Sequence, residues 1–155
     1  MNKNIIGKTV SSISRGDLLL NGQQNEEDLG PLEIVFTDGS SLTMALVSDG
    51  ESVCSEFTER QPNKLFAQNT EFQRVTLTNK EPFAKAVNSK VASIDILLFS
   101  SQRDSVDVVA GYRVNLENGH TIVYYNSGDF AKIYWDSLPP SLPSQFILKW
   151  ESTLK

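Results

Sequence analysis

The sequence predicts an α+β protein in which a mostly antiparallel sheet is built from two similar β-rich halves, with a few short helices and a C-terminal amphipathic helix. The first observation behind this prediction is a repeat: LEIVFTDGSSLTM, starting at Leu32, returns as YRVNLENGHTIVY, starting at Tyr112. The second is that apolar residues alternate around Asp38-Gly39 and Asn118-Gly119, as in β-hairpins. The third is helical spacing of apolar residues near the end of the chain.

The repeat has to be judged outside its turns, because any two amphipathic hairpins share apolar residues around a glycine. The copies lie 80 residues apart, from Gly39 to Gly119. Coincidence would explain the hairpins alone, whereas the ordered series of matches favours duplication within one domain. The apolar matches are Leu32/Tyr112, Ile34/Val114, Phe36/Leu116, Leu42/Ile122 and Met44/Tyr124, and the further matches are Gly7/Asn88, Asp49/Asp129 and Val53/Ile133.

The first half is expected to form a bent strand followed by a three-strand meander. Arg15-Gly16 interrupts the first strand, and a glycine inside a strand pattern often marks a bulge. Asp38-Gly39 supplies the turn of the hairpin. The expected elements are strands over 9–13 and 17–20, a polar acidic loop over 21–30, strands over 32–37 and 42–46, and strands over 52–57 and 72–78.

The second half is expected to begin with a short helix over 81–87, since proline is allowed in a first helical turn. A strand over 90–101 is apolar on both faces, which is typical of a covered central strand. Strands over 106–116, 121–126 and 130–135 follow. After Pro139-Pro140, the residues Phe146, Ile147, Trp150 and Leu154 predict an amphipathic helix over 142–154 that packs on the sheet.

The chain of 155 residues is expected to form a single domain over 1–155, with repeat halves of about 5–78 and 82–137. No apolar run approaches the length of a membrane helix, and the first residues do not have the pattern of a secretory signal. The single cysteine, Cys54, fits a reducing compartment. These observations predict a cytoplasmic protein that does not enter a membrane.

The residue composition and the motifs of the sequence indicate no catalytic, metal-binding or cofactor-binding site. The one histidine, His120, is expected at an exposed turn, and no ligand set with zinc-like spacing is present in the sequence. Phosphate-binding and nucleophile-elbow motifs are absent from it as well. We therefore expect no enzyme, no metal and no cofactor. An enzymatic reading would require the fold to bring Asp49, Asp129 or His120 together in a cleft.

Two features predict a surface that binds another protein. The net charge of −5 and the scattered lysines and arginines disfavour nucleic acid and favour a basic partner. Aromatic residues gather in the second copy of the repeat, where exposed Tyr and Trp side chains would anchor an interface. The candidate partner-binding residues are Glu26, Glu27, Asp28, Asp49, Glu51, Tyr125, Asp129 and Trp135.

The segments GPLEIVFTDGSSLTM from Gly30 and VAGYRVNLENG from Val109 resemble small uncharacterised bacterial proteins of the kind encoded beside polymorphic or secreted toxins. The resemblance covers about residues 5–135 and implies an immunity protein that binds a cognate toxin and occludes its active site. The alternative is a small-molecule or glycan-binding module with an aromatic-lined site between the two copies. The sequence leaves the oligomeric state open.

Overall fold

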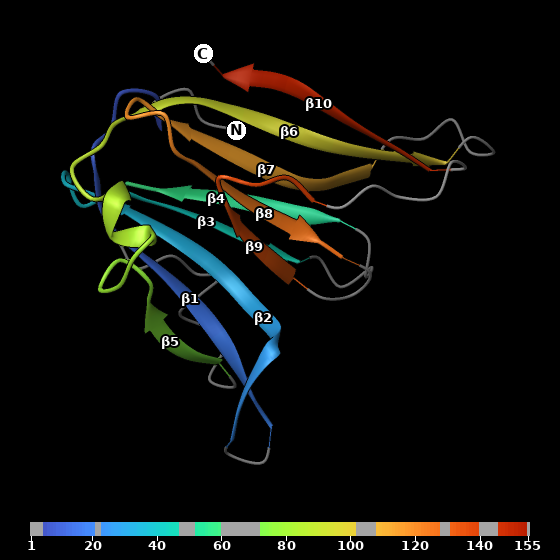
Figure 1. Ribbon diagram of the computed structural model, residues 1–155, viewed down its shortest axis with the longest axis horizontal. Helices are drawn as coiled ribbons and strands as arrows, with labels where there is room; N and C mark the ends of the chain where they lie inside the picture. The colour runs from blue at the N-terminus through green and yellow to red at the C-terminus, as the bar shows by residue number, and fades with distance from the viewer. Residues whose placement is uncertain are drawn as a thin grey trace.

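The computed structural model describes residues 5–20, 23–46, 52–59, 72–101, 108–127, 131–139 and 146–154. In these residues ten strands form two five-stranded antiparallel sheets (Figure 1). The first has the order β5-β1-β2-β3-β4 and contains β1 (Val10–Leu20), β2 (Gln23–Phe36), β3 (Ser41–Leu46), β4 (Val53–Thr58) and β5 (Phe72–Thr76). The second has the order β10-β6-β7-β8-β9 and contains β6 (Val91–Ser101), β7 (Val108–Leu116), β8 (Thr121–Asn126), β9 (Ala131–Trp135) and β10 (Phe146–Leu154).

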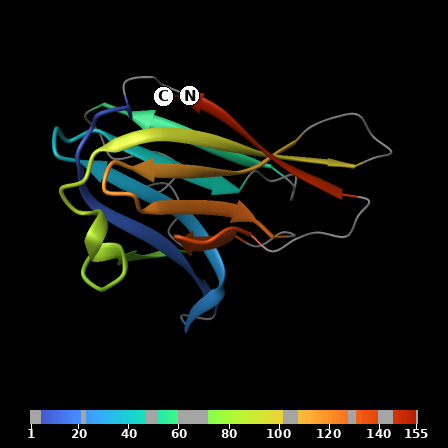
Figure 2. The same cartoon turned by 45° about the horizontal axis from the view of Figure 1, so that its top comes forward.

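The central strand of each sheet contacts an edge strand of the other. One residue pair, Leu29 with Ala131, joins β2 to β9, and β4 lies against β7. In Figure 1, β5 and β10 lie at opposite ends of the molecule, with β3, β4, β8 and β9 between them. Figure 2 shows β6, β7, β8 and β9 side by side. Each sheet therefore turns one face toward the other.

The predicted α+β class and the C-terminal helix over 142–154 are wrong. The described residues contain no α-helix, and the end of the chain is strand β10, which pairs antiparallel with β6. Phe146, Leu148 and Trp150 lie at every second position, as in a strand, whereas Phe146, Ile147, Trp150 and Leu154 lie at helical spacing, so the apolar pattern alone did not distinguish a strand from a helix. Pairing with β6 favours the strand, because the backbone N–H and C=O groups on the side of β6 away from β7 need hydrogen-bond partners.

Three smaller predictions also fail. Most of the expected loop over 21–30 belongs to β2. This strand begins at Gln23, which pairs with Leu20 of β1. Asn21 and Gly22, the dipeptide typical of two-residue hairpins, separate the paired residues and lie outside the described residues. The expected helix over 81–87 is a single 3-10 turn, η2 (Phe83–Ala86). The register between β1 and β2 does shift between Arg15 and Asp17, but the extra residue lies on β2, between Leu29 and Leu32, and β1 is one unbroken strand where two were expected.

The two sheets repeat the same hydrogen-bonding details. Gly39 and Gly119 both adopt positive φ, at 86° and 92°, and each N–H donates to a carbonyl at 3.0 Å. The side chains of Asp38 and Asn118 accept a hydrogen bond from the backbone N–H two residues later, at 2.9 and 3.1 Å. Because register, turns and strand order all recur, the sequence repeat corresponds to a structural repeat.

The repeat halves also contact each other in a symmetric way. Thr9 and Lys90, which are matched positions of the repeat, form an isolated antiparallel bridge. On one side of this bridge Gly7 donates its N–H to a carbonyl of the second half, and on the other Asn88 donates to the first half, both at 2.9 Å. Gly7 and Asn88 both have positive φ. The bridge therefore lies on a pseudo-twofold axis.

One part of the sequence match is shifted. Leu42 pairs with Phe57, and its counterpart Ile122 pairs with Trp135, so Phe57 and Trp135 are equivalent and lie 78 residues apart. By the same register Val53 corresponds to Ala131 and not to Ile133. The connection between β3 and β4 is two residues longer than the one between β8 and β9, which accounts for the shift.

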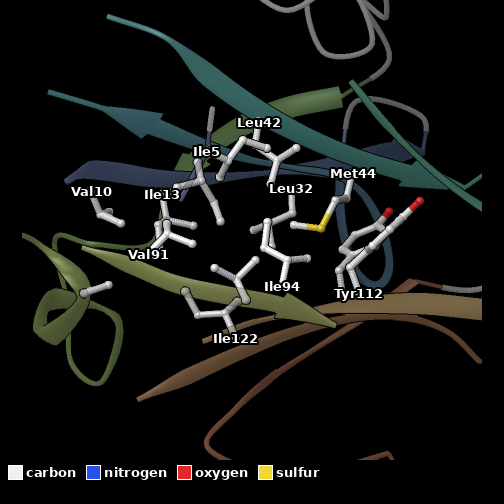
Figure 3. Close-up of a cluster of buried hydrophobic side chains, with 14 of the residues drawn as sticks. Ile5, Val10, Ile13, Leu32, Leu42, Met44, Val91, Ile94, Tyr112 and Ile122 are labelled. Carbon is white, nitrogen blue, oxygen red and sulfur yellow. The ribbon is translucent and has the colours of Figure 1, made fainter. Parts of the chain in front are cut away.

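A single apolar core lies between the sheets. Side chains from both halves form this core, and ten of them are labelled in Figure 3: Ile5, Val10, Ile13, Leu32, Leu42, Met44, Val91, Ile94, Tyr112 and Ile122. Tyr124 is the largest fully buried side chain of the core. Its hydroxyl donates to the carbonyl oxygen of Gly30 at 2.9 Å and so ties β8 to the first sheet. The two halves therefore share one interior.

Candidate functional site

The outer faces of the two sheets differ in chemistry although the scaffold is the same. On the first sheet the positions that face away from the core include Ser14, Glu33 and Thr43, which are buried, and Glu56, which is half-buried. The register places Asp95, Arg113, Val123 and Tyr134 at the equivalent positions of the second sheet. Arg74 and Trp150 also occupy equivalent positions. Arg74 lies opposite Gly16 in the first sheet, and Trp150 lies opposite Leu97 in the second.

These substitutions create a second apolar cluster, which we call the aromatic face. Its members lie apart from the main core: Leu97, Phe99, Ala110, Val123, Tyr125, Tyr134 and Trp150. Leu97, Val123 and Tyr125 are buried, whereas Phe99, Tyr134 and Trp150 are half-buried. The half-buried rings are therefore the part of this face that another molecule can contact.

Aromatic geometry and desolvation characterise this face. The rings of Tyr125 and Tyr134 lie 6.5 Å apart between centroids. Burial, together with the neighbouring Tyr134, raises the pKa of Tyr125, and burial raises the pKa of Tyr134. The guanidinium of Arg113 lies 4.4 Å from the centre of the Trp150 ring, within the range of a cation–π contact. Both tyrosines thus keep their protons at neutral pH.

A polar network borders the aromatic face. Arg113 donates to the Oδ2 atom of Asp95 from Nε at 2.9 Å and from Nη2 at 2.7 Å. The amide of Asn115 donates to the same carboxylate oxygen and to the Ser93 hydroxyl, both at 2.9 Å. Asp95 is buried, and these donors satisfy the hydrogen-bonding capacity of its Oδ2 atom. The network fixes the guanidinium that lies over Trp150.

Replacing Arg113 with methionine is expected to lower the free energy of unfolding by about 2 kcal/mol, because the Asp95 carboxylate loses two charged donors. Urea denaturation measures this loss. The double variant Arg113→Met/Asp95→Ala should lose less than the sum of the single changes. Strict additivity, or a loss below about 0.5 kcal/mol for Arg113→Met, would show that the network does not stabilise this face.

His120 forms a second polar cluster, at the turn between β7 and β8. Its Nδ1 lies 2.6 Å from Oδ2 of Asp136, whose Oδ1 accepts the Thr121 N–H at 2.8 Å. Burial would raise the pKa of Asp136, but the bonds from Thr121 and His120 outweigh it and lower that pKa. The rings of His120 and Trp135 lie 5.0 Å apart. Asp136, the residue after β9, is therefore linked to both His120 and the start of β8.

The structure separates the two predicted aromatic anchors. Tyr125 lies on the aromatic face but is 4% exposed. Trp135 packs against the main core and contacts the ring of Phe83 at 5.2 Å, so it lies on the opposite face of the sheet. Tyr125 is therefore covered, and Trp135 is half-buried away from it.

The predicted acidic residues are placed only in part. Glu26, Glu27 and Asp28 lie in β2, and their side chains are outside the description. Asp49, Glu51 and Asp129 lie outside the described residues.

Sequence reasoning missed the residues that set the second outer face apart. Arg113 and Asp95 were not considered, and Trp150 was assigned to a helix. The signal was available, because lining up the two copies shows Glu33 replaced by Arg113 and Thr43 by Val123. His120 was expected at an exposed turn; it lies at that turn but is half-buried, and the pairing of β8 with β9 brings Asp136 to it.

Other chemistry is limited in the described part of the chain. No group of three or more His, Cys, Asp or Glu side chains there is arranged to hold a metal ion. Cys54 is half-buried, and burial raises the pKa of its thiol, which keeps it protonated. No helix among the described residues has the length and apolar character needed to cross a membrane.

Comparison with known proteins adds no assignment. No family model, curated protein or solved structure matches the chain.

Proposed function

We propose that this protein binds another protein, and that the partner is a cognate toxin which it neutralises as an immunity protein. The observation that carries the proposal is the contrast between the outer faces: positions that hold Glu56 and Arg74 on the first sheet hold Tyr134 and Trp150 on the second. The scaffold alone does not require this difference, since the first sheet has the same strand order without it.

The chemistry of the aromatic face supports a protein partner. Tyr, Trp and Arg are the residues that most often contribute strongly to protein interfaces. Tyr134, Trp150 and Arg113 lie on the same side of the second sheet, with Arg113 against Trp150, and each is partly exposed. The net charge of −5 would speed the encounter with a basic partner. Binding there would cover the toxin's active site, and we place this event in the cytoplasm, without cofactor or catalysis.

The alternative of a small-molecule or glycan site between the two copies finds less support. Tyr112 and Tyr124 are aromatic residues that lie between the sheets, and both are buried. Tyr124 also uses its hydroxyl within the core. These rings fill the interior, so the alternative would need an aromatic site elsewhere in the molecule.

The proposal is tested by co-expression with the product of the adjacent gene in the native host. The wild-type protein is expected to relieve growth inhibition by that product and to co-purify with it. The Phe99→Ala/Tyr134→Ala variant should lose protection, while Glu56→Ala, which changes the position equivalent to Tyr134, should retain it. Absence of both protection and co-purification with the wild-type protein would refute the proposal. Equal protection by the wild type and both variants would show that the aromatic face does not bind the partner.

A further inference from the structure

We propose that two copies of this chain pair through β10, antiparallel, about a twofold axis at Trp150. β10 ends the strand order of the second sheet, and β6 is its one neighbour in the described pairing (Figure 1). An edge strand of nine residues presents backbone donors and acceptors along its outer side, which another strand can use. The proposal does not depend on the proposed function.

The sequence of β10 is complementary to itself in this arrangement. A twofold axis at Trp150 pairs every residue with the one equally far on the other side of it. The resulting cross-strand pairs are Leu148 with Ser152, Lys149 with Glu151, and Trp150 with its own copy; the register of β10 shifts between Ser152 and Leu154, so the regular pairing ends there. The two tryptophan positions therefore lie opposite each other at the centre, with an opposite-charge pair on each side.

Charge selects this register. Lys149 of each copy lies opposite Glu151 of the other, so the pairing forms two opposite-charge pairs. A shift of the axis by one residue, to Glu151, would instead place two glutamates opposite each other. Lysine and glutamate on an edge strand usually oppose pairing with foreign strands, but at these two positions they favour a second copy of the same strand.

The equivalent edge strand of the first sheet, β5, is not complementary to its own copy. β5 is a strand of five residues, Phe72–Thr76, whose centre is Arg74. A twofold axis at its centre would place two arginines opposite each other, which is unfavourable. Arg74 also forms an ion pair with Glu33 of its own sheet. β5 therefore lacks the self-complementary charge pattern of β10.

Pairing through β10 would join the two aromatic faces. A twofold axis perpendicular to a sheet keeps each face on its own side, so the outer faces of the two copies become continuous. Trp150 belongs to the aromatic face and lies on the axis. The dimer would therefore contain a ten-stranded sheet whose outer side combines two aromatic faces.

Charge reversal tests the proposal on the full chain. Sedimentation equilibrium of the wild-type protein should show a monomer–dimer equilibrium. Lys149→Glu and Glu151→Lys should each weaken dimerisation about tenfold or more, because each places like charges opposite each other twice. The double variant Lys149→Glu/Glu151→Lys should dimerise as the wild type does, and an equal mixture of the two single variants should form a heterodimer.

Lys80→Glu, an exposed lysine outside the strands, is the control for the change in net charge and should leave dimerisation unchanged. A wild-type protein that stays monomeric at high concentration would overturn the proposal. A dimer that survives both single changes, or one that the double variant does not restore, would show that β10 is not the dimer interface. Circular dichroism of each variant separates a loss of pairing from a loss of folding.

Discussion

Replacing Tyr124 with alanine is expected to lower the free energy of unfolding by about 4 kcal/mol, one of the two largest effects we expect from a single change. The side chain is fully buried in the core, and its hydroxyl donates to the Gly30 carbonyl of the other sheet. The substitution leaves a cavity and also an unsatisfied carbonyl oxygen. Urea denaturation, followed by circular dichroism, measures the loss.

Tyr124→Phe separates the two contributions. It keeps the ring and removes the hydroxyl, so we expect a loss of about 1 kcal/mol. A loss of less than about 2 kcal/mol for Tyr124→Ala would contradict the placement of this ring between the sheets.

The same variant tests whether the halves share one core. The chain has one cysteine, Cys54 in β4, and two tryptophans, Trp135 and Trp150 in the second sheet. Thiol reactivity therefore reports on the first sheet, and tryptophan fluorescence reports on the second. We expect Tyr124→Ala to shift both transitions to the same lower urea concentration. Separate midpoints would show that the sheets unfold independently.

Gly111→Ala is expected to lower the free energy of unfolding by about 3 kcal/mol. A Cβ atom at Gly111 would lie 2.3 Å from the backbone oxygen of Tyr124 and 3.1 Å from the Cα of Tyr125. Both atoms belong to the backbone of β8, so β7 and β8 would have to separate. Thermal and urea denaturation measure the effect.

Gly119→Ala provides a matched glycine substitution with a different cause. Nothing lies within 4 Å of a Cβ at Gly119, and its φ of 92° makes strain the only cost, of about 1–2 kcal/mol. Gly111→Ala should therefore destabilise more than Gly119→Ala. The reverse order would contradict the close approach of β7 to β8.

Local pattern predicted the repeated hairpins, because each contains its own turn. Asp38-Gly39 and Asn118-Gly119 determine a positive φ at the glycine, and alternation determines which residues face the core. Long-range pairing was not predictable in the same way. The apolar pattern of residues 146–154 fits a strand as well as a helix, and the β6 edge with which β10 pairs lies some fifty residues earlier in the chain.

The candidate site was predictable only as a tendency. The sequence indicated that aromatic residues gather in the second half, but adjacent residues on a strand face opposite sides. Tyr124 and Tyr125 illustrate this, since the first lies in the main core and the second on the aromatic face. The contact of Arg113 with Trp150 joins β7 to β10 across β6, and it could be inferred only once β10 was known to be a strand.

The central claim is that function resides on the outer face of the second sheet and not on that of the first. The most direct test is the affinity of the partner for Tyr134→Ala and for Glu56→Ala, which change equivalent positions, measured by isothermal titration calorimetry. We expect Tyr134→Ala to weaken binding about thirtyfold, as for a hot-spot residue, and Glu56→Ala to bind like the wild type. Wild-type affinity for Tyr134→Ala together with a loss for Glu56→Ala would contradict the claim.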